Sequence, residues 1–367
     1  MPTPHDEDSI IRYDVEHAAF AASNLLGHPM LLGLKNHNYP GAKSMLLDMP
    51  TWNLPIFKWA AGQGAVGGYA HSGFNMRTSS SRLPTYDIPN IGPWGAAECL
   101  VTVTHGVVDF VAGGQFDPKD ELNFWYHLLN CGFKLTRIGE TNYHMGLPRC
   151  GMVRTYVKLD NKPIGDDGYG AWIGGIKSGK AYFGDGRSHL IDFAANGHPM
   201  GHEPLKMCGP GRVVVTAKVA ARLEETPVDP ETEEGMPTFY WHLERARMGS
   251  SRSVAVEIIV NGEVAETREV LADGDLIEVS AAIDVDRSSW IALRILPSSH
   301  TNPIFIEVAG QPVRVSRRSA QWCLDCIDQL WDKARIDIRE SERNAAETAW
   351  NHARQMYCAI KSECNDD

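Results

Sequence analysis

The chain of 367 residues carries 35 Lys and Arg against 46 Asp and Glu, a formal net charge of −11 at pH 7. This length predicts about two domains at ~150 residues each, and the negative charge without a Lys/Arg stripe argues against binding to a nucleic-acid backbone. No apolar run reaches the ~18 residues of a membrane span. The start, MPTPHDEDSIIRYD, is polar and acidic and lacks the pattern of an export signal, so we expect a cytoplasmic protein.

The eight cysteines are scattered along the chain, unlike those of a small disulfide-bonded scaffold. Cys323 and Cys326 form a C-x-x-C, but it lies in WCLDCIDQLW, which has a helical pattern. Because no second pair accompanies it, core cysteines are favoured over a metal or redox site.

Two short apolar runs come first along the chain. IIRYDVE (10–16) predicts a strand that ends at Glu16, and in GHPMLLGLK (27–35) His28 opens the next apolar run. Taken singly, Glu16 could be a solvated glutamate and His28 a turn residue.

The next unit pairs a helix with a strand. WNLPIFKWAAGQ (52–63) has helical apolar spacing, and GAVGGYA (64–70) reads as a buried strand with His71 at its carboxyl end. Catalytic groups of α/β barrels gather at the carboxyl ends of their strands, so His71 is a candidate site residue.

A second unit has the same pattern. The apolar, β-branched run AAECLVTVTHGVVDFV (96–111) carries Glu98 and His105 and is expected to be a strand. PKDELNFWYHLLNCG (118–132) predicts an amphipathic helix, because proline and acids begin it and Gly132 follows its end.

FKLTRIGETNYH (133–144) predicts a strand that ends in Glu140, Asn142 and His144, the densest polar cluster of the chain. If the strand ends meet at one edge of a sheet, these residues and the earlier histidines and glutamates would form a metal site. That convergence depends on the fold.

The second half of the chain changes character. From Pro210 the apolar pattern has a period of two, as in GRVVVTAKVAARL, and Asn261-Gly262 separates two such runs, so an antiparallel β-sandwich is expected. Amphipathic helical patterns follow. The predicted domains are an α/β barrel portion (1–205), an all-β sandwich (206–316) and a helical tail that packs on a domain (317–367).

Several segments together resemble the carbaryl-hydrolase-like (CehA/McbA) metallohydrolases of the PHP (polymerase and histidinol phosphatase) group. They are GYAHSG, AECLVTVTHGVVDF, NFWYHLLNCGFKLTRIGETN, VRTYVKLD, GDGRSHLIDF, RSSWIALRILPSSHTNPIF and RRSAQWCLDCIDQLW, between about residues 12 and 358. The resemblance implies a distorted (β/α) barrel with up to three divalent metals at the carboxyl ends of its strands, followed by a β-sandwich.

The resemblance also implies roles for individual residues. It places metal ligands at five positions: Glu16, His28, His71, Glu140 and Asn142. His105 and His144 are the candidates for proton transfer, because imidazole titrates near neutrality.

Two departures from the family pattern stand out. The H-x-H ligand pair of the first PHP strand occurs nowhere in this sequence, so the resemblance implies an incomplete barrel. Asn142 stands where the family has aspartate, and a neutral amide binds a divalent cation more weakly and cannot act as a base. His144 could compensate as a ligand.

These observations predict a hydrolase that uses water activated by Zn²⁺, Mn²⁺ or Fe²⁺ on a small-molecule ester, carbamate or phosphoester. The alternative from another class is a degenerate barrel without catalysis, which binds a ligand or forms a homo-oligomer through the sandwich and the tryptophan-bearing tail. A third reading is a fragment of a longer enzyme.

Overall fold

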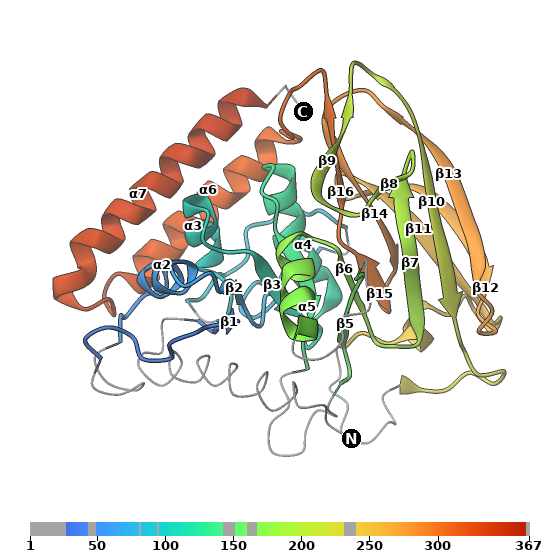
Figure 1. Cartoon of the computed structure of the whole chain (residues 1–367), viewed down its shortest axis with the longest axis horizontal. Helices are drawn as coiled ribbons and strands as arrows, with labels where there is room; N and C mark the ends of the chain where they lie inside the picture. Colours follow the sequence, from blue (N-terminus) through green and yellow to red (C-terminus); the bar gives the residue numbers. More distant parts are fainter. Residues whose placement is uncertain are drawn as a thin grey trace.

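The computed structural model describes residues 27–42, 49–80, 82–93, 95–141, 151–159, 167–230 and 240–364. A small α/β sheet with its helices lies between two long C-terminal helices on one side and a set of larger β-sheets on the other (Figure 1). The helices are α2 (Leu54–Ala61), α3 (Cys99–Thr102), α4 (Pro118–Asn130), α5 (Asp167–Lys177), α6 (Arg317–Ala334) and α7 (Glu340–Glu363), with 3-10 turns η1 (Val103–His105) and η3 (Leu243–Ala246).

The α/β sheet has four strands in the order β1-β2-β3-β4. They are β1 (Pro29–Leu32), β2 (Val66–Tyr69), β3 (Phe110–Gly113) and β4 (Thr136–Gly139). Strands β2, β3 and β4 are parallel, whereas β1 runs antiparallel to β2 with Pro29 opposite Tyr69. The start of β1 therefore shares one edge of the sheet with the carboxyl ends of the three parallel strands.

Local signals explain helix α4. The Asp117 side chain accepts a hydrogen bond from the Lys119 main-chain nitrogen, Pro118 occupies the first turn, and Gly132 past the end has a φ of 88°. The helix predicted at 118–132 is thereby confirmed. The helix within 52–63 and the strands within 64–70 and 133–144 are also present.

The strand predicted over 96–111 is wrong for most of its length. Its first part forms α3 and η1, and only the last residues enter β3. The apolar side chains of α3 are fully buried, and the Tyr357 hydroxyl of α7 donates to the Leu100 carbonyl oxygen at 2.7 Å. Packing against α7 thus outweighs the β propensity of the valines and threonines.

The remaining strands form two sheets that share one apolar core, as expected of a sandwich. One has the order β13-β10-β7-β8, and the other contains β12-β11-β14-β15-β6-β5 together with β16 and β9. Their bounds are β5 (Arg154–Val157), β6 (Ala181–Gly184), β7 (Ser188–Ala195), β8 (His198–Pro199), β9 (Gly201–Met207), β10 (Gly211–Ala221), β11 (Ser253–Val260), β12 (Glu263–Leu271), β13 (Ile277–Val285), β14 (Ser289–Ile295), β15 (Ser299–Thr301) and β16 (Ile304–Val308).

The pairing is antiparallel except between β9 and β16, and Asn261 and Gly262 turn between β11 and β12 with φ values of 55° and 97°. The predicted hairpin is confirmed. The boundary of the sandwich differs from the one expected at 206, because β5 to β9 already belong to these sheets. Strands β5 and β6 have four residues each, too few to show a period-two pattern.

The C-terminal helices α6 and α7 lie side by side against α3 and α4 (Figure 1). Cys323 and Cys326 are buried on α6, which confirms that they are core residues. The α/β part, the sandwich and these helices share a continuous apolar core. No helix within the described ranges is long and apolar enough to cross a lipid bilayer.

Candidate functional site

Three of the predicted site residues meet at one edge of the α/β sheet. Ala70 donates its main-chain N–H to the His28 carbonyl oxygen at 2.9 Å, directly before His71 at the end of β2. The Glu140 N–H donates to the Gly113 carbonyl oxygen at 2.9 Å, so it extends the pairing of β3 and β4 by one residue. Main-chain hydrogen bonds at the sheet edge therefore hold all three residues.

His71 and Glu140 are in direct contact. One carboxylate oxygen, Oε1 of Glu140, accepts from the His71 main-chain N–H at 2.7 Å and from its Nδ1 at 3.0 Å. The side chains are 8% and 7% exposed. Because a carboxylate accepts the Nδ1–H, the lone pair of the neutral His71 ring lies on Nε2.

The rings of His28 and His71 lie edge to face, with centroids 4.4 Å apart and planes at 72°. His71 itself has a φ of 58°, in the left-handed region that few non-glycine residues adopt. Such backbone strain is concentrated at functional sites, which adds to the case for this one.

Two glycines bring the chain segments close enough to position His28. Gly27 has a φ of 64°, and a Cβ there would lie 2.1 Å from the carbonyl oxygen of Gly95. Gly95 has a φ of 79°, and a Cβ on it would lie 2.8 Å from the His71 carbonyl oxygen. No side chain fits at either position without moving the backbone beside the histidines.

A buried polar network lies next to His71 and Glu140. Arg137 of β4 donates through Nη2 to Glu121 Oε2 at 2.6 Å and through Nη1 to Ser72 Oγ at 2.6 Å. Neither Arg137 nor Glu121 is exposed at all. The other Glu121 oxygen accepts from the main-chain N–H groups of Gly114 and Phe116.

Burial dominates the electrostatics of this pair. It raises the pKa of Glu121 and lowers the pKa of Arg137, and their mutual attraction opposes both shifts. Neither residue is among the site residues predicted from the sequence. The available signal was an arginine inside the otherwise apolar strand LTRIG, where a charged side chain needs a buried partner.

The remaining predicted residues do not join this cluster. Glu16, Asn142 and His144 lie outside the described residues. His105 belongs to η1, which precedes β3 and so lies toward the opposite end of the sheet, and its ring contacts that of His352 on α7 at a tilt. Its place beside α7 corrects the expectation that it would lie at a strand end with His71.

The donor types at the sheet edge suit a divalent transition metal, because imidazole and carboxylate are common ligands of Zn²⁺, Mn²⁺ and Fe²⁺. Glu140 accepts both hydrogen bonds from His71 through Oε1, so Oε2 is the second carboxylate oxygen that could bind a metal. Among the residues that the structure describes, no group of three or more His, Cys, Asp or Glu is arranged to hold a metal ion.

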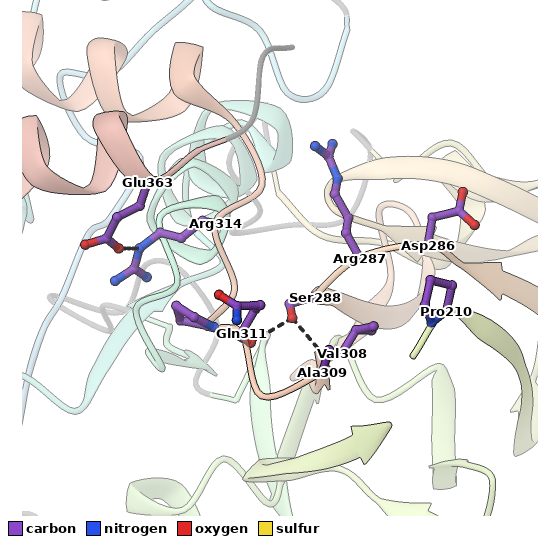
Figure 2. A pocket seen from close by; sticks show the side chains of 10 residues that line it. Pro210, Asp286, Arg287, Ser288, Val308, Ala309, Gln311, Arg314 and Glu363 are labelled. Carbon is purple, nitrogen blue, oxygen red and sulfur yellow. Dashed lines mark hydrogen bonds and ion pairs between the residues drawn. The ribbon is translucent and has the colours of Figure 1, made fainter. Parts of the chain in front are cut away.

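A cavity of about 870 Å³ lies elsewhere, between the sandwich and the end of α7 (Figure 2). Two pairs of its polar groups are in contact: Arg314 pairs with Glu363 at 2.6 Å, and the Ser288 hydroxyl donates to the Gln311 carbonyl oxygen at 2.7 Å. None of the predicted site residues lines it.

Comparisons of the chain with protein-family models, with curated proteins and with solved structures found no match.

Proposed function

We propose that this chain is a metal-dependent hydrolase of the carbaryl-hydrolase-like, PHP type, with an incomplete barrel and its site at the edge of the β1–β4 sheet. The observation that carries the proposal is the convergence of His28, His71 and Glu140 from separate strands. Glu16 and Asn142 are the further ligands that the sequence pattern suggests.

The described residues have distinct tasks in this proposal. Glu140 fixes the proton on Nδ1 of His71, which places the lone pair of the neutral ring on Nε2, the nitrogen that would bind a cation. A bound divalent metal supplies a water of lowered pKa. The buried Arg137–Glu121 pair holds Ser72, the neighbour of His71, through the hydrogen bond that Arg137 Nη1 donates to Ser72 Oγ.

The substrate class remains a small-molecule ester, carbamate or phosphoester, since the three share an electrophilic centre that a hydroxide attacks. His144 is the proposed proton shuttle. The position of His105 beside α7 removes the support for the same role there.

Metal analysis after extensive dialysis tests the site. The expected result is at least one tightly bound Zn²⁺, Mn²⁺ or Fe²⁺ per chain, lost in His71→Ala and weakened in Glu140→Gln by about 10- to 100-fold, as when an orienting partner is removed. His198→Ala is the matched control, because His198 is a half-buried histidine of β8, outside the His71 cluster, whose Nε2 lies 2.8 Å from the Glu203 carbonyl oxygen. The control should keep its metal.

Turnover is then measured with the metal-loaded protein on p-nitrophenyl acetate, a p-nitrophenyl carbamate and bis(p-nitrophenyl) phosphate. Hydrolysis that disappears with His71→Ala supports the enzyme. Protein without metal above background would refute the proposal and favour the degenerate ligand-binding barrel. Bound metal without turnover on any substrate would refute the hydrolase alone.

A further inference from the structure

A pocket of about 410 Å³ opens between the start of α2, the 3-10 turn η1 and helix α7. Its volume lies within the ~300–1,000 Å³ of small-ligand sites. Trp52 and Pro55 contribute apolar surface, and Lys58, His105 and His352 contribute nitrogen groups. The pocket lies on the α7 side of the molecule and shares no lining residue with the His71 cluster.

The rings of the two histidines of this pocket lie against each other in a tilted arrangement, with centroids 4.4 Å apart and planes at 32°. Nε2 of His105 lies 3.4 Å from the Ala349 carbonyl oxygen, and Nε2 of His352 lies 3.2 Å from the Thr104 carbonyl oxygen. Because a carbonyl oxygen only accepts, each Nε2 carries a hydrogen. A second proton on either ring therefore goes to Nδ1.

The charges that face His105 all have one sign. Lys58 approaches from α2 and His352 from α7, and the described residues that line the pocket include no Asp or Glu. Burial, aided by His352 and Lys58, lowers the pKa of His105 to about 4. The imidazole of His105 is therefore neutral at pH 7, and only an added negative charge would favour its protonation there.

An all-basic lining is unexpected in a chain with a net charge of −11. Lys58 would repel a cation, whereas it would donate a charge-assisted hydrogen bond to an anion. The apolar surface of Trp52 and Pro55 beside these donors suits a ligand that is charged at one end and apolar at the other.

We propose that this pocket binds a small organic anion, a carboxylate or sulfonate on an apolar body, through Lys58 and the His105–His352 pair. Binding takes one proton from solvent onto Nδ1 of His105, the ring that is neutral at pH 7. His105 then donates that proton to the anion in a charge-assisted hydrogen bond. The proposal does not depend on the metal site.

The probe is benzenesulfonate, which keeps its charge between pH 5 and 8, and its neutral control is benzenesulfonamide. Isothermal titration calorimetry at several pH values, in buffers with different ionisation enthalpies, measures affinity and proton uptake together. We expect benzenesulfonate to bind with net proton uptake and to weaken as the pH rises, by at most about tenfold per pH unit. Benzenesulfonamide should not bind measurably.

Two variants test the assigned donors. Lys58→Gln should weaken benzenesulfonate binding by about fivefold, as expected for an exposed charge, and His105→Gln should remove the proton uptake. Lys119→Gln at the exposed start of α4 and His198→Gln on β8 are the controls and should bind like the wild type. Because Lys58 is exposed, its variant is informative even if His105→Gln fails to fold.

Three outcomes would overturn the proposal. These are equal binding of the sulfonate and the sulfonamide, affinity that does not change with pH, and no effect of Lys58→Gln. Zn²⁺ binding that tightens with rising pH and is lost in His352→Gln would instead make the pair a cation site. Retained metal at His71 alongside any of these results would leave the proposed hydrolase untouched.

Discussion

Replacing Glu121 by Gln is expected to destabilise the protein strongly although the two side chains have nearly the same shape. Glu121 accepts from Arg137 Nη2 at 2.6 Å and from Trp241 Nε1 at 3.0 Å through the same oxygen, Oε2. A glutamine amide can present only one oxygen, so either these donors or the main-chain donors at Oε1 would meet an NH₂ group.

The magnitude follows from burial. Arg137 is fully buried, and Glu121→Gln removes the carboxylate that its guanidinium contacts directly. Removing one partner of a buried ion pair costs about 3–5 kcal/mol, against about 5–15 kcal/mol for the stability of a whole domain. Arg137→Met should lower the free energy of unfolding less at low pH than at high pH, because the carboxyl group of Glu121 can take up a proton at low pH.

The pH dependence of Arg137→Met has a definite sign. Burial already raises the pKa of Glu121 in the folded protein, and loss of Arg137 removes the attraction that opposes this shift. The folded variant then binds more protons than the unfolded chain between the unfolded and folded pKa values. Its free energy of unfolding should therefore increase as the pH falls from 8 toward 5.

Urea unfolding followed by circular dichroism, with a double-mutant cycle on Glu121 and Arg137, measures these quantities. The double variant should be less destabilised than the sum of the single variants. The control is Glu263→Gln at the surface pair Arg82–Glu263, whose side chains are 73% and 63% exposed, with an expected cost below about 1 kcal/mol. A cost of Glu121→Gln as small as that of the control, or additivity in the cycle, would refute the reasoning.

Three further predictions concern stability. Burial raises the pKa of Glu98 to about 8, so the folded state favours the protonated carboxyl group. The free energy of unfolding should therefore fall as the pH rises from about 4.5 to 8, by at most about 1.4 kcal/mol per pH unit. Glu98→Gln should flatten that slope in urea titrations carried out at each pH. Gly27→Ala should cost more than about 1 kcal/mol in thermal unfolding, because its Cβ would lie 2.1 Å from the Gly95 carbonyl oxygen; a neutral result would contradict the described backbone. Asn302→Ala should cost at least about 2 kcal/mol in urea unfolding, because Asn302 bonds both the N–H and the carbonyl oxygen of Arg137, and an unchanged midpoint would disprove this link between β4 and the sandwich.

Local signals in the sequence predicted those elements that depend on a few adjacent residues. Helix α4 begins at Asp117–Pro118 and ends before Gly132, and the hairpin turns at Asn261–Gly262. Caps, proline and glycine act within about one turn of chain, so their effects can be read without the rest of the fold.

In the apolar run 96–111, local patterns do not predict the secondary structure correctly. Its β-branched residues suit a strand, but a short apolar run is compatible with a buried helix as well. A helix forms here because α7, more than 200 residues away, packs its Tyr357 on α3. No pattern within residues 96–111 predicts that contact.

The candidate site divides in the same way. The sequence by itself determined that His71 and Glu140 follow buried strands and that His28 precedes one. Only the parallel order β2-β3-β4 brought His71 and Glu140, 69 residues apart, into hydrogen-bond contact. The Arg137–Glu121 pair belongs wholly to the tertiary structure, because a buried charge is tolerated only when the fold places its partner beside it.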